Sequence, residues 1–366
     1  MKMDEDKCDK ASRKHTIITV LGIASMILLM LVNIAGAAQS TNVWFHKGSE
    51  LMNLGKYNEA IKAYDKAIEI NPQDSDAWYN KGLALEHLNK SNEAIRAYEN
   101  AIKINPHYAD AWTNKGNALR RFGESDEAIK AYGKVIESDP HNSSIDWYNK
   151  GLDLDNLNKS DEAIKAYDKA IEIDPQNSMA WNNKGNALTN LNKSDEAIKA
   201  YDKAIEINPQ NSDAWTNKGL TLTILGEYNE AIKACGKAIE INSQNSIAWN
   251  NKGNALTNLN KSDEAIKAYD KAIEINPQNS IAWTNKGLIL TFLGKYNEAI
   301  KACDKAIEIN PQNSIAWNNK GLTLSSLGKY NEAIKAYDKA IEINPQDSAA
   351  WYNKAVTLNR LNKSNL

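Results

Sequence analysis

The chain has 366 residues, of which 25% are charged, and a formal net charge of −2. Its length would accommodate about two or three globular domains, and the balanced charge excludes the strongly basic surface typical of nucleic-acid-binding proteins. Three cysteines in a chain of this length provide neither a disulfide framework nor zinc-ligand spacing.

The N-terminal part differs from the rest of the chain. Residues 1–15 are polar and carry five basic side chains, whereas residues 16–38 contain no charged residue. About 20 apolar residues suffice to cross a bilayer, so a single-pass membrane protein is predicted, with residues 1–15 cytoplasmic and the remainder extracytoplasmic. The alternative is a signal peptide cleaved near residues 35–37, which would release a secreted protein. The long apolar core of the segment favours the anchor.

Two residue types recur with one period along the rest of the chain. All ten tryptophans lie 34 residues apart, except for one step of 35 between Trp112 and Trp147. The eight prolines form a second series with the same period, in which Ser243 takes the place of a missing proline. Such a period indicates stacked supersecondary units instead of separate globular domains.

Each unit of the period is predicted to form two helices. The first is expected to begin at a Ser or Asp cap, as at Ser280, and to end near a Gly or Asn such as Gly226 or Asn192. The second helix ends before a proline, which cannot continue it.

Seven positions of the first unit, residues 41–74, carry a recognisable pattern. Positions 4, 8, 11, 20, 24, 27 and 32 are Trp44, Gly48, Leu51, Ala60, Tyr64, Ala67 and Pro72. This pattern resembles the tetratricopeptide repeat. The resemblance implies an all-α fold, a right-handed α-solenoid of stacked helix pairs whose first helices line a concave groove.

Nine repeats are predicted over 41–347, followed by a terminal capping half-repeat at 348–366. The repeats are 41–74, 75–108, 109–143, 144–177, 178–211, 212–245, 246–279, 280–313 and 314–347.

Lysine at position 7 departs from the family pattern, in which leucine is more usual. It is present in every unit, from Lys47 to Lys354. At about 100° per residue the position lies to one side of the Trp–Gly–Leu stripe. The alkyl stem is therefore expected to follow the edge of the core and keep the ammonium in water.

A catalytic centre is not predicted anywhere in the chain. The five histidines are scattered, no glycine-rich phosphate loop is present, and repeats fill residues 41–361. We therefore expect no enzyme activity, metal, cofactor or small-molecule substrate. Cys235 and Cys303 replace tyrosine at position 24 of two repeats, and we interpret them as buried hydrophobic residues too far apart for a disulfide.

Position 6 is the first candidate for partner binding, because it faces away from the tryptophan stripe. Asparagine occupies it in nine units: Asn80, Asn114, Asn149, Asn183, Asn217, Asn251, Asn285, Asn319 and Asn353. This series resembles the asparagine ladder of O-linked N-acetylglucosamine transferases, which implies sequence-tolerant binding of a peptide backbone. The alternative is that these polar residues merely keep the helix soluble.

Positions 2, 9 and 13 share this face and differ between the two halves of the chain. They are charged near the N-terminus and apolar further on, and the apolar candidates are Ile281, Leu288, Phe292, Ile315 and Leu322, with Ile247, Leu220 and Ile224 beside them. A row of exposed apolar side chains is typical of a binding surface. Alternatively, position 2 is covered by the second helix of the preceding repeat.

Asn-x-Ser sequons make glycosylation of an exported chain possible. They are Asn89, Asn142, Asn158, Asn192, Asn260 and Asn362. Five of the six occupy the place where other repeats carry a helix-closing glycine, so a structural role explains them without any glycan.

The favoured function is a membrane-anchored interaction scaffold whose groove binds an extended peptide segment of a protein partner. The alternatives are a structural spacer of the cell envelope and an accessory subunit of an enzyme complex. Residues 180–212 and 248–280 are identical, which favours a spacer, because a specific binding site would normally differ from unit to unit. The asparagine series and the apolar positions favour the scaffold.

Overall fold

The computed structural model describes residue 26 and residues 40–364. It divides into two compact units, Met1–Lys159 (unit 1) and Ser160–Leu366 (unit 2). Within the described residues the secondary structure is entirely helical, without a strand.

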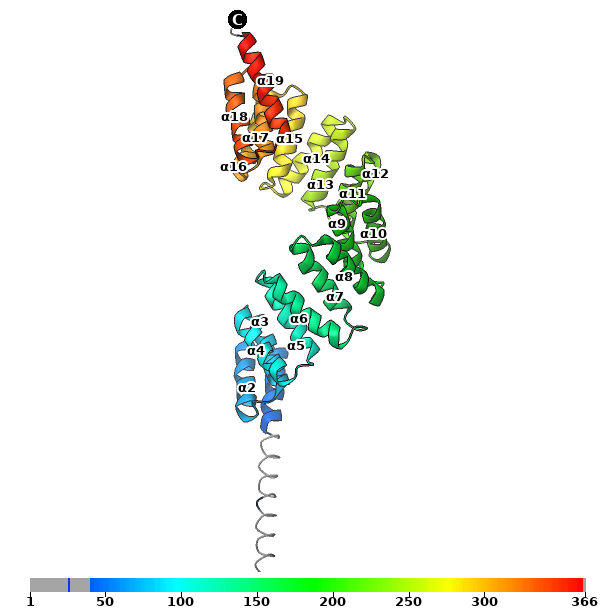
Figure 1. The fold of residues 1–366 in the computed structure, drawn as a ribbon, viewed down its shortest axis with the longest axis vertical. Helices are drawn as coiled ribbons and strands as arrows, with labels where there is room; N and C mark the ends of the chain where they lie inside the picture. Colours follow the sequence, from blue (N-terminus) through cyan, green and yellow to red (C-terminus); the bar gives the residue numbers. More distant parts are fainter. Residues whose placement is uncertain (1–25, 27–39, 365–366) are drawn as a thin grey trace, which may run out of the picture. The chain divides into compact units, whose positions relative to one another are not determined.

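The helices follow one another along the chain with short turns between them (Figure 1). In unit 1, residues 40–53 are helical and are followed by α2 Tyr57–Ile70, α3 Ser75–His87, α4 Ser91–Ile104, α5 Ala109–Arg121, α6 Ser125–Ser138 and α7 Ser144–Asn156. The first helices of unit 2 are α8 Ser160–Ile173, α9 Ser178–Asn190, α10 Ser194–Ile207, α11 Ser212–Leu225, α12 Tyr228–Ile241 and α13 Ser246–Asn258. The remaining helices are α14 Ser262–Ile275, α15 Ser280–Phe292, α16 Tyr296–Ile309, α17 Ser314–Ser326, α18 Tyr330–Ile343 and α19 Ser348–Ser364.

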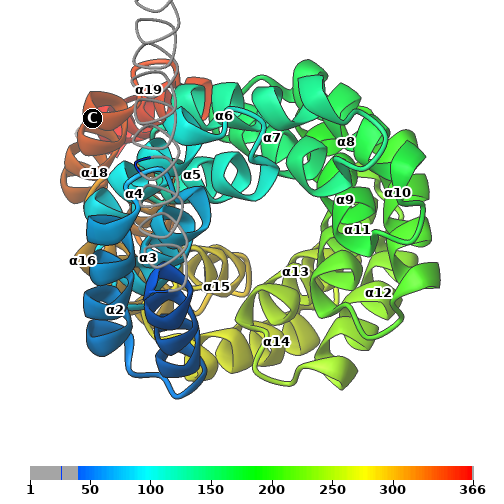
Figure 2. The same cartoon turned by 90° about the horizontal axis from the view of Figure 1, so that it is seen from below.

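Odd-numbered helices are the first helices of repeats, and even-numbered helices are the second. Within each unit every helix packs against the next one, and odd-numbered helices also contact the following odd-numbered helix. In unit 2, α9, α11 and α13 lie on the inner side of the stack and α10, α12 and α14 on the outer side (Figure 2). The predicted solenoid of stacked helix pairs is thus confirmed.

The glycine at position 8 allows the two helices of a repeat to approach each other closely. A Cβ on Gly253 would lie 2.5 Å from Cε1 of the buried Tyr269, well inside van der Waals contact. In two repeats the glycine instead faces Cys235 or Cys303, which are free and fully buried. Burial raises the pKa of both thiols to about 12, so they stay protonated at neutral pH. Their predicted role as buried hydrophobic residues is confirmed.

The first helices end as expected, and the expected Asp cap is found at Asp74, whose side chain accepts a hydrogen bond from the backbone N–H of Ala77 at 3.0 Å. Asn192 and Gly226 both adopt positive φ angles, 59° and 86°, which close the preceding helix. The expected cap at Ser280 is wrong: the side chain of Asn279, one residue earlier, accepts a hydrogen bond from the backbone N–H of Ala282 at 3.1 Å. An asparagine carbonyl reaches the first turn of the helix from that position.

The tryptophan and proline series share a period because the two positions are hydrogen-bonded. The indole N–H of Trp283 donates to the carbonyl oxygen of Pro277 at 3.1 Å, and Trp249 donates in the same way to Ser243 at 3.3 Å. Ser243 preserves the contact because the acceptor is a backbone carbonyl, which any residue supplies.

The lysine at position 7 joins consecutive repeats, as Lys286 shows. Lys286 Nζ lies 5.5 Å from the ring centroid of Trp283 and 2.6 Å from a carboxylate oxygen of Asp270 in the preceding repeat, and its side chain is 22% exposed. The ammonium thus has two partners that the sequence did not predict. The carboxylate neutralises it and the face of the indole attracts it.

Candidate peptide-binding groove

The inner face of unit 2 carries a row of exposed apolar side chains. Ile247, Ile281 and Ile315 are 60–61% exposed, and Phe292 is 67% exposed. The alternative that position 2 is covered by the second helix of the preceding repeat is therefore wrong for these three isoleucines. We call Ile224, Ile247, Ile281, Phe292 and Ile315 the apolar row. Leu288 and Leu322, two further candidates, are only half-exposed.

The position-6 asparagines mostly bind the preceding repeat. Asn217 Nδ2 donates to Asn182 Oδ1 at 3.1 Å, and Asn353 donates to Asn318 at the same distance. These acceptors at position 5 were not foreseen, since they lie 35 residues earlier in the sequence. The asparagines therefore help to hold neighbouring repeats together, and their predicted contact with a ligand stays a prediction.

Three members of the series are buried, namely Asn149, Asn251 and Asn319. Asn149 accepts from Arg120 and donates to Asn117, so it belongs to a bonded network in unit 1. The other six members of the series are half-buried: Asn80, Asn114, Asn183, Asn217, Asn285 and Asn353.

Polar side chains of the first helices in unit 1 include one ion pair and one short hydrogen bond. Arg121 forms an ion pair with Glu86 at 3.2 Å, and the hydroxyl of Thr113 donates to Asp146 at 2.7 Å. Burial raises the pKa of the Asp146 carboxyl, although this hydrogen bond favours its charged form. These four polar side chains bind one another, whereas the apolar row of unit 2 is exposed.

A hollow of about 770 Å³ opens beside the apolar row, between α11, α13 and α15 and the turns after α14 and α16. We call it the Asn251 hollow. Its lining residues are Leu220, Ser246, Ile247, Asn250, Asn251, Asn254, Asn276, Gln278, Asn279, Ser280, Ile281, Ile309 and Asn310. None of these side chains is charged, so the hollow suits an uncharged ligand.

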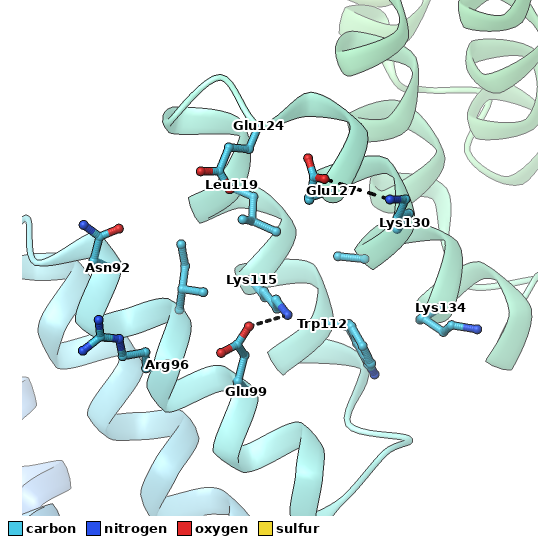
Figure 3. Close-up of a pocket in the computed structure, with 12 residues that line it drawn as sticks. Asn92, Arg96, Glu99, Trp112, Lys115, Leu119, Glu124, Glu127, Lys130 and Lys134 are labelled. Carbon is cyan, nitrogen blue, oxygen red and sulfur yellow. Dashed lines mark ion pairs between the residues drawn. The ribbon is translucent and has the colours of Figure 1, made fainter.

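Another hollow, of about 630 Å³, lies in unit 1 between α4, α5 and α6 (Figure 3). Two ion pairs line it: Lys115 of α5 lies 2.8 Å from Glu99 of α4, and Lys130 lies 4.0 Å from Glu127 within α6. Equivalent hollows recur in unit 2 around Trp181 and around Trp317. This feature belongs to the repeat itself, which makes it a weaker candidate for a specific site.

Family models match most of the repeat region. One described as the tetratricopeptide repeat (TPR) matches residues 75–108, 109–142, 145–177, 178–211, 246–279, 280–313 and 314–347. The chain belongs to the tetratricopeptide repeat family. Two further TPR models match residues 48–89, and 200–233 and 336–366. TPR proteins generally mediate protein–protein interactions.

Several solved structures resemble this chain at low sequence identity. The Cut9–Hcn1 hetero-tetramer of the APC/C has a chain with a TM-score of 0.58 at 15% identity, covering 87% of this chain and 76% of that one. A TPR protein from Parabacteroides merdae has a TM-score of 0.57 at 17% identity, covering 68% of this chain and 98% of that one. YrrB, described as a TPR protein with an unusual peptide-binding site, has a TM-score of 0.41 at 26% identity, covering 52% and 99%. The first two likenesses show the shared fold. Among curated proteins no match is found.

The predicted membrane segment and glycosylation sites of this TPR protein lie only partly within the described residues. The predicted segments 1–15 and 16–38 lie outside them, apart from Met26. In the part of the chain that the structure describes, no helix is long and apolar enough to span a bilayer, and no cluster of His, Cys, Asp or Glu could hold a metal ion. Asn89, Asn158, Asn192 and Asn260 adopt the helix-closing positive φ, while glycosylation of these and of Asn142 and Asn362 stays a prediction.

Proposed function

We propose that the chain is a non-catalytic interaction scaffold whose unit 2 groove binds an extended peptide segment of a protein partner. The apolar row carries this proposal: large aliphatic and aromatic side chains stay more than half exposed on successive first helices. Isolated exposed apolar residues are ordinary, but a row of them on one face marks an interaction surface.

The exposed area of the apolar row sets how much free energy peptide binding could gain. Burying a Val, Leu, Ile or Phe side chain fully is worth about 1.5–3 kcal/mol. Covering the exposed part of Ile247, Ile281 and Ile315 would then contribute roughly 1–2 kcal/mol for each residue, before the entropic cost of ordering the peptide. An extended segment spanning several repeats would collect this contribution once per repeat.

The test is a binding measurement on the purified full chain with two groove substitutions. Ile281→Asp and Phe292→Asp place unpaired charges where the peptide would lie, so partner capture should fall at least about tenfold. Ile145→Asp is the matched control, because Ile145 occupies position 2 of a unit 1 repeat and is 65% exposed. Equal loss in the control, or full capture by the groove variants, would contradict the proposal.

A structural spacer is the second candidate, and the identity of residues 180–212 with 248–280 favours it. A spacer needs length from its repeats and no groove ligand. Failure of the full chain to bind any protein, in the same capture measurement, would support this second function over the first.

We propose further that residues 16–38 anchor the chain in a membrane, with residues 1–15 cytoplasmic and the repeats extracytoplasmic. The support is the absence of charge in residues 16–38 together with the five basic residues before them. N-terminal sequencing of the protein from a membrane fraction should find an intact N-terminus. A chain that begins just after Ala37 would instead indicate a cleaved signal peptide and a secreted protein.

A further inference from the structure

Two buried carboxylates lie on one helix of unit 1, α7. Among the residues that the structure describes, the only charged side chains that are buried are Asp146, which is 5% exposed, and Asp153, which is fully buried. Their spacing of seven residues places them on the same face of α7, about two turns apart. The preceding repeat carries fully buried alanines at the same positions, Ala111 and Ala118. α7 thus has carboxylates where that repeat has methyl groups in its core.

Neutral hydroxyl groups of the preceding repeat are the hydrogen-bond partners of both carboxylates. Thr113 of α5 donates to Asp146 at 2.7 Å, and Ser125 of α6 donates to Oδ1 of Asp153 at 2.8 Å. The second carboxylate oxygen of Asp153 is buried without a hydrogen-bond partner. A hydroxyl group can accept as well as donate, so both contacts are retained when the carboxyls take up protons. Protonation therefore removes the buried charge without removing a contact.

Charged and titratable groups on α5 and α6 act on these carboxylates with opposing signs. On α5, the charge of Asp110 repels that of Asp146, whereas the charge of Arg120 attracts that of Asp153. On α6, burial raises the pKa of Tyr132, and the two carboxylate charges add to this effect, so the phenol stays neutral. One cation therefore acts on two buried anions. α7 itself carries a further carboxylate at residue 155, which is half-buried.

The balance of these effects favours the protonated form of both groups. Burial is the largest effect and raises the pKa of Asp146 and of Asp153, while the hydrogen bonds from Thr113 and Ser125 oppose it. The folded chain therefore binds these protons more tightly than the unfolded chain does. The packing of α7 is most stable below the ordinary Asp pKa, and it weakens as the pH rises through the raised values.

Hydrogen bonds join this part of α7 to both helices of the preceding repeat. Asn149, three residues after Asp146, accepts from Arg120 at 2.8 Å and donates to Asn117 at 3.2 Å. Asn117 also accepts from the hydroxyl of the buried Tyr132 at 3.0 Å. Because α5 and α7 are both first helices, a change in how firmly α7 packs would alter the side chains that these helices present together.

We propose that α7 is a pH-sensitive element of unit 1. In acid Asp146 and Asp153 are neutral and α7 packs firmly against α5 and α6, whereas at higher pH both ionise and α7 opens more often. Opening here is a local loss of packing that leaves the rest of the chain folded. This inference goes beyond the scaffold function and does not depend on it.

Hydrogen exchange of the purified full chain, followed by mass spectrometry between about pH 4.5 and about pH 8, tests the proposal. After correction for the intrinsic pH dependence of exchange, the protection of the α7 amides should fall at least about tenfold, the change that one unit of pKa shift produces. α13 is the internal reference, because it carries Ala248 and Ala255 at the same positions. Protection of α7 that stays constant relative to α13, or rises with pH, would overturn the proposal.

Variants of the full chain show whether the two carboxylates are the cause. Asp146→Ala combined with Asp153→Ala supplies the alanines of the preceding repeat and should remove the pH dependence of α7 protection. Asp146→Asn combined with Asp153→Asn removes the charge at constant size and should do the same. Glu137→Ala is the control, since this exposed carboxylate of α6 forms only a surface ion pair with Lys134 at 2.8 Å.

The control should keep the pH dependence of the parent chain. Protection of α13 verifies that each variant is folded. If α7 protection falls with pH as steeply in both double variants as in the parent, the carboxylates are not responsible and the proposal is wrong.

Discussion

Replacing Gly253 with alanine is expected to lower the free energy of unfolding of unit 2 by about 1–3 kcal/mol. The new methyl group would lie 2.5 Å from Cε1 of Tyr269, whose ring is held by the contacts of its hydroxyl. Its hydroxyl donates to Asn254 Oδ1 at 2.9 Å and lies 3.0 Å from the hydroxyl of Thr257. Urea denaturation followed by circular dichroism should therefore give a lower midpoint.

The matched control is the same substitution in a Tyr269→Ala background, where the methyl group meets no ring. Alanine is about 1 kcal/mol better than glycine inside a helix, so Gly253→Ala should stabilise that background. An equal loss of stability in the presence and absence of the Tyr269 ring would contradict the steric explanation.

Replacing Asp153 with alanine is expected to raise the free energy of unfolding of unit 1 by about 1–3 kcal/mol at neutral pH. Asp153 is fully buried at a position where the equivalent residues of α3 and α5 are Ala84 and Ala118. Its Oδ1 accepts from the hydroxyl of Ser125 at 2.8 Å, but Oδ2 has no partner. A single hydrogen bond does not offset the cost of removing an ionised carboxylate from water. Asp153→Asn, which keeps the size and removes the charge, should recover part of the same gain.

The pH dependence of this effect has a definite sign. Burial raises the pKa of the Asp153 carboxyl, against the opposing effects of Ser125 and Arg120. The folded protein therefore binds the proton more tightly than the unfolded chain, and stability falls as the pH rises from the ordinary Asp pKa through the raised one. The advantage of Asp153→Ala over the parent protein should be largest at neutral pH and shrink on acidification. A constant difference in urea midpoints between pH 7 and about pH 4 would contradict this assignment.

Asparagine at position 6 shows which properties of a residue could be predicted from the sequence and which could not. The helical period predicted only that it faces away from the tryptophan stripe, and the family resemblance implied that this face lines the groove. Its partners did not follow, because they depend on how far one repeat slides along the next. Asn217 faces Asn182, which accepts its hydrogen bond, whereas the residue 35 positions before Asn251 is Thr216. The bonding of each asparagine therefore depends on a residue in the adjoining repeat. The cap at Asn279 was missed for a smaller reason, a shift of one residue in a turn where both Asn and Ser are good caps.

The sequence by itself determined the helix pairs and their period, because these depend on local helix geometry repeated every 34 residues. Only the tertiary structure decided that Ile247, Ile281 and Ile315 stay exposed and that Asn251 lacks an acceptor. A helical period tells which residues share a face. Whether the neighbouring repeat covers that face, or bonds to it, depends on packing between helices that are distant in the chain.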